Sequence, residues 1–255
     1  MLARSRIVPV RRALALRRDG LTQIGVVVAA VGAYEGARML MVPNWPEAFS
    51  NARTVLHLER VAGFAWEASL QRVFLEIPDV LQVLNVFYFV GHFLLTGVFF
   101  VWLYHRSRDG FRLFRDAFLV ATALSLLVHW WFPTAPPRLA GIGLEDTLRA
   151  LSGIDIGSPQ SSALSNPVAA VPSLHAAYAL GVGVGLIVFG RLLVVRLVGV
   201  LYPPLVVLTI VVTGNHFFFD ALAGTAVLAT GFLVAWRLRS GRNQQRGRPS
   251  TACLT

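Results

Sequence analysis

Long apolar segments alternate with shorter polar stretches along most of the chain. The apolar segments cover residues 21–42, 81–104, 116–132, 171–189, 197–213 and 217–236. A helix that crosses a bilayer needs roughly 20 apolar residues, and each segment is close to that length. The pattern predicts an all-α integral membrane protein in which six transmembrane helices form one bundle.

The predicted membrane domain covers residues 21–236, between basic tails at 1–20 and 237–255. A cleaved signal peptide is the alternative for the first apolar segment. That segment is long for a signal core, and it ends in Met39-Leu40-Met41 rather than in small residues that suit cleavage. We therefore interpret it as a span.

Two connecting segments carry patterns of their own. After Pro43 to Pro46, polar residues recur on one helical face and apolar residues on the other, which predicts an extracytoplasmic amphipathic helix over residues 55–78. Such a helix either lies in the membrane surface or packs over the bundle, and the pattern favours neither. Loop 133–170 is rich in Pro, Gly and Ser. Loops of this length often act as lids, so we expect it to cover a site.

The distribution of charge predicts the orientation. The formal net charge is +10, every basic residue is arginine, and 55% of all residues are hydrophobic. Four arginine clusters stand at Arg4–Arg18, Arg106–Arg115, Arg191 with Arg196, and Arg237–Arg248. Six spans place all four on one side, which the positive-inside rule makes cytoplasmic. We expect a multi-pass cell-membrane protein whose arginines contact anionic lipids, and no nucleic-acid partner.

Two short motifs place histidines where apolar segments begin. They are Val171-Pro172-Ser173-Leu174-His175 and Gly214-Asn215-His216-Phe217-Phe218-Phe219-Asp220. Bilayer insertion does not require such residues, and ionisable groups within membrane segments usually serve a function. With six spans, both motifs and Arg138 fall at extracytoplasmic span ends. We therefore expect one site at that face.

The spacing of His216 and Asp220 suits a catalytic pair. Residues four apart share one face of a helix, so the carboxylate can accept one imidazole N–H and leave the other nitrogen as a nucleophile or base. His175 is a candidate proton donor to a departing oxygen, and Ser173 is either a phosphate ligand or an ordinary helix cap. A structural His–Asp pair is the alternative for His216 and Asp220.

Arg138, which follows Pro136-Pro137, is the candidate anion clamp because a guanidinium matches two phosphate oxygens. Asn215 joins Arg138 and Ser173 in the predicted phosphate-binding set. An arginine at the membrane interface can also be a simple anchor. We interpret His92 and His129 as core or lining residues, and Gly181, Gly183 and Gly185 as close helix packing.

At these residues the chain resembles the type 2 phosphatidic acid phosphatase superfamily, over a core of about 80–236. Pro172-Ser173-Leu174-His175 and His216-Phe217-Phe218-Phe219-Asp220 match the family's motifs. The first motif is present only as Pro136-Pro137-Arg138, and Thr209 and Ile210 stand where the third motif has Ser-Arg. This reduced pattern is more similar to the inositol-phosphotransferase branch, which includes inositol phosphorylceramide synthase.

The resemblance implies a membrane lipid phosphatase or phosphotransferase that needs no metal and no other cofactor. It implies that His216 forms a phosphohistidine, that Asp220 orients it, and that His175 is the general acid. The substrate would be a lipid phosphate or phospholipid, and the acceptor a lipid hydroxyl, a sugar hydroxyl or water. A transferase and a phosphatase both fit this pattern.

Two other classes of function remain open on the residues. His175, His216 and Asp220 form a two-His, one-carboxylate set of the kind that binds a metal ion. A lipid transporter or scaffold without chemistry is the third class, although it does not account for the charged triad of His175, His216 and Asp220.

Overall fold

The computed structural model describes residues 7–155 and 166–246, which are helical almost throughout. Within these residues no β-strand occurs, and Thr134 and Ala169 form a single isolated bridge. In chain order the elements are α1 (Ile7–Met39), α2 (Trp45–Ala62), α3 (Glu67–Leu75), α4 (Pro78–Val86), the π-helix η1 (Phe87–Gly91), α5 (His92–Arg106), α6 (Arg108–Trp131), the 3₁₀ turn η2 (Pro137–Leu139), α7 (Thr147–Ser152), α8 (Leu174–Phe189), α9 (Leu193–Val212) and α10 (Phe218–Arg246). The chain divides into two units, Met1–Val42 with α1 and Pro43–Thr255 with the remaining elements.

Four helical segments in the described part of the chain are long and apolar enough to cross a membrane. They are Asp19–Met39, Pro78–Arg106, Leu193–Val212 and Phe218–Gly241. The predicted third span coincides with α6, which begins with several charged residues, and the predicted fourth with α8, which is apolar but has 16 residues. The all-helical membrane architecture is confirmed, and the count of six spans remains a prediction.

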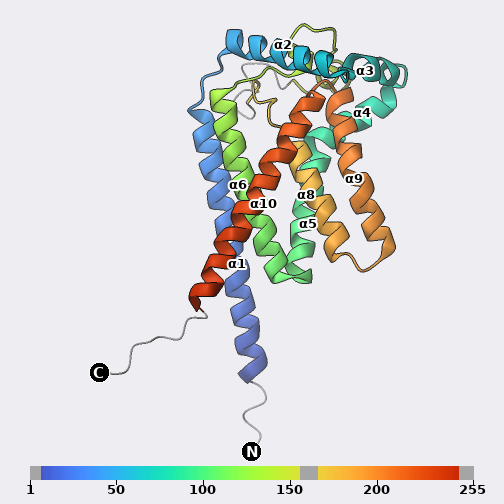
Figure 1. The fold of residues 1–255 in the computed structure, drawn as a ribbon. Helices are drawn as coiled ribbons and strands as arrows, with labels where there is room; N and C mark the ends of the chain where they lie inside the picture. The colour runs from blue at the N-terminus through green and yellow to red at the C-terminus, as the bar shows by residue number, and fades with distance from the viewer. Residues whose placement is uncertain (1–6, 156–165, 247–255) are drawn as a thin grey trace, which may run out of the picture. The chain divides into compact units, whose positions relative to one another are not determined.

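In the second unit α8 lies at the centre of the bundle. It packs against α9 on one side and α10 on the other, and α6 packs along α10 (Figure 1). Aromatic residues of α5 and α6, including Phe99, Phe114 and Phe118, fill the core between them. Burial of this apolar surface fixes how the helix ends are arranged, and the site is built on those ends.

Glycines allow α8 and α9 to approach closely. A Cβ at Gly183 would lie 2.6 Å from the carbonyl oxygen of Gly199 and 2.6 Å from Pro203. A Cβ at Gly181 or Gly185 would likewise meet aromatic side chains of α5 and α6. The interpretation of these glycines as helix packing is confirmed.

The two ends of the bundle differ in what covers them. At one end, here called the capped end, α6 stops and α8 and α10 begin, and α2 lies across them (Figure 1). The opposite end carries the turns at 106–108 and 190–192, with one arginine cluster each, and the end of α10, where the cluster that begins at Arg237 lies. The fold thus groups these clusters away from His175, His216 and Asp220, and the orientation in the membrane remains a prediction.

The prediction of one amphipathic helix over residues 55–78 is wrong. The chain leaves α2 at Ala62 through Gly63, whose φ of 80° is left-handed, and α3 begins only at Glu67. Glycine takes a positive φ without the steric cost that other residues pay. The segment therefore folds as two helices joined by a short turn.

The polar faces of α2 and α3 point inward rather than to water. Glu59, Glu67 and Gln71 are at most 2% exposed, whereas Val61 is 74% and Val73 is 64% exposed. A buried carboxylate is costly unless it has hydrogen-bond donors. The hydrogen bonds of these two carboxyl groups therefore explain why the polar faces point inward.

The carboxylates of α2 and α3 cap the start of α10. Glu59 Oε1 accepts from the backbone N–H of Phe219 at 2.7 Å, and Glu67 Oε1 accepts from that of Phe218 at 3.2 Å. Asp220 Oδ2 accepts from the N–H of Phe217 at 2.9 Å. The first N–H groups of a helix have no partner within it, and its N-terminus attracts negative charge. Each of these three carboxyl groups accepts one of the hydrogen bonds that the start of α10 offers.

Burial raises the pKa of Glu59 to about 9, and the adjacent Glu67 carboxyl adds to this effect. Glu59 is therefore neutral at pH 7 and can keep its hydrogen bond to Phe219 without burying a charge.

We predict that Gly183→Ala lowers the free energy of unfolding by about 1–3 kcal/mol, because the added methyl group separates α8 from α9. The measurement is thermal unfolding of purified protein in detergent. The control is Gly97→Ala in α5, where a Cβ meets nothing within 4 Å; it should be neutral or slightly stabilising. Equal effects of the two substitutions would contradict the close contact.

We predict that the stability of Glu59→Gln depends less on pH than that of the wild type. The raised pKa stabilises the folded state fully below the ordinary glutamate pKa, and this contribution is lost as the pH rises towards about 9. The variant should thus gain melting temperature relative to wild type as the pH rises. The exposed Glu76→Gln is the control, and parallel curves for wild type and Glu59→Gln would refute the prediction.

Candidate functional site

His216 lies in the turn that joins α9 to α10. Gly214, with φ of 71°, provides the left-handed residue of this turn, and the N–H groups of Asn215 and His216 both donate to the Ile210 carbonyl at 3.0 Å. The expectation that His216 and Asp220 lie on one helix is wrong, because α10 begins at Phe218. The end of α9 therefore fixes the histidine backbone.

The contact between His216 and Asp220 nevertheless forms. His216 Nδ1 lies 3.0 Å from Asp220 Oδ2 and 3.0 Å from the Ala170 carbonyl oxygen. A carbonyl oxygen only accepts hydrogen bonds, so the proton is assigned to Nδ1. The lone pair then belongs to Nε2, which is the arrangement that a nucleophilic imidazole needs.

The environment of His216 favours the neutral ring. The side chain is buried, and burial lowers its pKa to about 3; the positive charge of Arg138 acts in the same direction. Ala170 opposes this shift through its hydrogen bond, but burial has the larger effect. Nε2 therefore keeps its lone pair at neutral pH.

His175 stands in the first turn of α8 beside His216. The centroids of the two imidazole rings are 5.7 Å apart, and the His175 ring stacks on Tyr88 at 4.4 Å. Nε2 of His175 is buried and has no hydrogen-bond partner among the described residues. This nitrogen is free to exchange a proton with a group that lies between the two histidines.

Ser173 is the N-cap of α8. Its Oγ accepts from the N–H of Ala176 at 3.3 Å, and its own N–H donates to the Asp220 carbonyl at 2.9 Å. Helix α8 begins at Leu174, so Pro172 precedes the cap. The carbonyl of Pro172 accepts from Nε2 of His129 at 3.2 Å.

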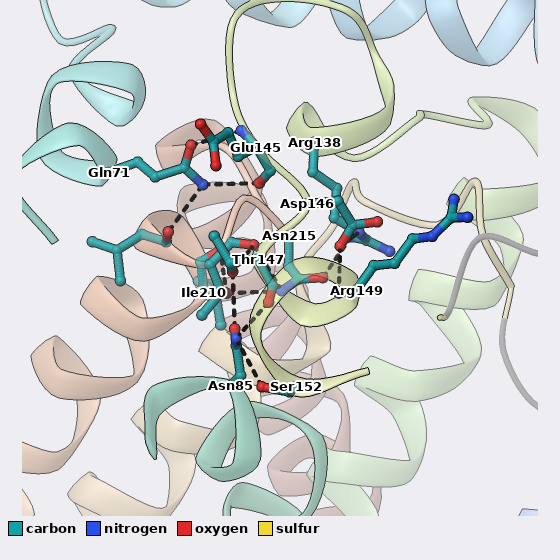
Figure 2. A network of polar contacts seen from close by, with 12 residues as sticks. Gln71, Asn85, Arg138, Glu145, Asp146, Thr147, Arg149, Ser152, Ile210 and Asn215 are labelled. Carbon is teal, nitrogen blue, oxygen red and sulfur yellow. Dashed lines mark hydrogen bonds and ion pairs between the residues drawn. The ribbon is translucent and has the colours of Figure 1, made fainter. Parts of the chain in front are cut away.

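Arg138 approaches the same turn from loop 133–170. Its backbone N–H donates to the Gly214 carbonyl at 2.9 Å, and its guanidinium donates through Nη1 to Oδ1 of Asn215 (Figure 2). Nε of Arg138 forms an ion pair with Oδ1 of Asp146 at 3.4 Å. Arg138 is 9% exposed, so it is a buried part of the site rather than a surface anchor.

Several polar atoms at the capped end are buried without a hydrogen-bond partner in the described part of the chain. They include Nε2 of His175, Oδ1 of Asp220 and Nε of Arg138. Most buried polar groups in proteins are hydrogen-bonded, and exceptions need an explanation. A polar ligand that contacts His175 and Arg138 would give partners to those two nitrogen atoms.

The described part of loop 133–170 contacts the site at both of its ends. Arg138 and Asp146 lie near its beginning, and the Ala170 carbonyl at its end holds His216. Residues 156–165, within the same predicted lid, lie outside the described residues. The loop is thus a wall of the site, and its action as a lid remains a prediction.

Sequence reasoning missed the aromatic neighbours of His175. Tyr88 lies in η1, a π-helix, and His92 follows it with its ring centroid 5.1 Å from that of His175. Nδ1 of His92 is 2.8 Å from the Tyr202 hydroxyl. Short π-helices often mark functional sites, but no sequence pattern reveals one. His92 is a lining residue, as the sequence indicated.

The metal-binding alternative lacks a ligand set. Among residues 7–155 and 166–246 no group of three His, Cys, Asp or Glu side chains is arranged to hold a metal ion. Nδ1 of His216 faces Asp220 Oδ2, so these two residues form a hydrogen bond with each other instead of facing a shared metal position.

One of three comparisons with known proteins found a match. The family model described as the PAP2 superfamily matches residues 53–234. A search of the curated proteins and a search of the solved structures each found no match. The matched region begins earlier than the expected limit of about 80 and thus includes Glu59 and Glu67. It covers most of the chain and every candidate site residue from Arg138 to Asp220, and the chain therefore belongs to the PAP2 superfamily.

Proposed function

We propose that this protein is a membrane enzyme that transfers a phosphate-bearing group of a lipid through a phosphohistidine on His216. PAP2 superfamily members are phosphatases and phosphotransferases. The observation that carries the proposal is the position of His216 Nδ1, which lies 3.0 Å from the Ala170 carbonyl oxygen and 3.0 Å from Asp220 Oδ2. This contact assigns the proton to Nδ1 and leaves the lone pair on Nε2, as a nucleophilic imidazole requires.

In the first step Nε2 of His216 attacks phosphorus, and the bond from phosphorus to the leaving oxygen breaks. His175, in its protonated form, gives its proton to that oxygen. Asp220 holds the Nδ1 proton and stabilises the positive charge that the ring acquires. The intermediate is a phosphorylated His216 beside a neutral His175.

In the second step the oxygen of an acceptor hydroxyl attacks the same phosphorus, and the bond to Nε2 breaks. The acceptor proton moves to His175, so both histidines return to their starting forms. No redox change takes place. Arg138, Asn215 and Ser173 are the proposed contacts of the phosphate oxygens, with Arg138 providing the positive charge.

We further propose that the enzyme is a phosphotransferase of the inositol-phosphotransferase type. Its acceptor is a lipid or sugar hydroxyl, and its site lies at the extracytoplasmic face. The motif pattern and the grouping of the arginines at the opposite end of the bundle support it. The alternative is a lipid phosphate phosphatase that uses water. The experiment is to incubate purified protein with lipid phosphates and with phosphodiester lipids, with and without hydroxyl acceptors, and to identify the products by mass spectrometry.

We predict that His216→Gln abolishes turnover and the covalent phosphoenzyme, because the nucleophile is lost. Asp220→Asn should reduce kcat by roughly 10²- to 10⁴-fold, as for other orienting carboxylates. The readouts are product formation and acid-labile, base-stable phosphorylation of the protein. His57→Gln, an exposed histidine of α2, is the control. Near-normal turnover by His216→Gln would exclude the covalent mechanism.

We predict that Arg138→Lys loses about 10²- to 10³-fold in kcat although the charge is kept. A compact ammonium does not reproduce the two-pronged contact of a guanidinium with phosphate. Arg149→Lys is the matched control, since that exposed side chain lies on α7 close by. Wild-type kinetics for Arg138→Lys would show that backbone N–H groups hold the phosphate instead.

A further inference from the structure

Arg138, the proposed anion clamp, already forms an ion pair with a carboxylate of this chain. Oδ1 of Asp146 lies 3.4 Å from Nε of Arg138, and the two side chains are 19% and 4% exposed. So little water screens the pair that the carboxylate offsets much of the arginine's positive charge. At the same time Nε donates no hydrogen bond to any residue that the structure describes, so the ion pair leaves this donor available to a ligand.

The position of Asp146 is fixed by its helix. Its side chain is the N-cap of α7 and accepts from the N–H of Arg149 at 3.2 Å. The next residue, Thr147, donates to Oδ1 of Asn85 at 2.9 Å and to the Thr213 carbonyl at 3.3 Å (Figure 2). The carboxylate is thus tied to α4 and to the end of α9. It does not swing away freely when a ligand arrives.

Among the described residues of the second unit, no other buried cation at the capped end compensates for this carboxylate. The sequence contains no lysine, and the other described arginines of the capped end are exposed: Arg53, Arg60, Arg72 and Arg149. His216 is neutral. The fixed charges around a bound phosphate therefore include the Arg138 guanidinium and the Asp146 carboxylate.

We propose that Asp146 is a specificity-determining residue that makes the site favour a phosphate with one negative charge over a phosphate with two. A phosphodiester carries one charge, whereas a phosphomonoester carries about 1.5 to 2 at neutral pH. The doubly charged group is attracted more strongly by Arg138, but it is also repelled more strongly by Asp146, and this repulsion offsets the advantage that Arg138 alone would give it. This inference rests on the proposed function, because it assigns the substrate class of the same site.

Asp146→Asn tests the proposal without removing the helix cap. Asparagine caps helices as well as aspartate does, so α7 is retained while the negative charge is lost. Glu145→Gln is the matched control. It removes the same charge one residue away, from an exposed side chain, and Gln71 holds its backbone in place at 2.8 and 3.0 Å.

The measurement is kcat/KM for a lipid phosphomonoester and for a phosphodiester lipid with the same acyl chains. Asp146→Asn should raise the ratio of monoester to diester activity by at least about tenfold, and Glu145→Gln should leave this ratio within about twofold of wild type. Asp146→Ser, which also caps a helix, should behave like Asp146→Asn. An unchanged ratio in both Asp146 variants would overturn the proposal.

A binding measurement separates this inference from the proposed function. At about pH 8, where inorganic phosphate is mostly doubly charged, Asp146→Asn should bind inorganic phosphate more tightly than wild type, with a smaller change for dimethyl phosphate. If wild type turns over neither lipid but Asp146→Asn and wild type differ in binding as predicted, the proposed function fails and the role of Asp146 stands. Equal changes for the two ions would refute the role of Asp146.

Discussion

The N–H groups at the start of α10 need hydrogen-bond acceptors, and several elements of the second unit provide them. Three consecutive backbone N–H groups lie at a buried helix end, where water does not satisfy them, and each unsatisfied group costs several kcal/mol in an apolar environment. Asp220, Glu67 and Glu59 each accept one of these hydrogen bonds. Because Glu59 and Glu67 lie on α2 and α3, the same demand explains why those helices turn their polar faces inward.

The site is held together mainly by backbone groups from different segments. The Arg138 N–H binds the Gly214 carbonyl, the Ser173 N–H binds the Asp220 carbonyl, and the Ala170 carbonyl binds the His216 ring. The first two of these bonds join backbone to backbone and thus fix segments to one another independently of side-chain rotamers, and the third holds the His216 ring. The functional side chains therefore start from well-defined positions, which is what preorganised stabilisation of charge requires.

The sequence predicted the parts of the fold that depend on local pattern. Every predicted span contains a helix, and His216, Asp220, His175 and Arg138 meet at one end of the bundle, since apolar length and motif position are local properties. The local pattern could not predict which face of the helices in residues 55–78 is buried. A periodic pattern shows that a helix has two faces, but the buried face depends on a partner 160 residues later in the chain.

The roles of Tyr88 and Asp146 were missed for a related reason. Tyr88 reaches His175 from a π-helix inside an apolar span, and Asp146 reaches Arg138 from a short helix within loop 133–170. Neither residue belongs to a recognisable motif. Their positions follow from tertiary packing of α4, α7 and the end of α9.

Asp220 serves the fold and the chemistry with the same oxygen atom, because Oδ2 faces both the Phe217 N–H and the His216 ring. Replacement of His216 removes a nucleophile but leaves the Phe217 N–H satisfied, whereas replacement of Asp220 by an apolar residue also leaves a buried donor without a partner. In a lineage that gave up the reaction, selection for a folded protein would therefore continue to preserve the aspartate after the histidine had drifted. An aspartate retained beside a lost histidine would mark such an inactive descendant.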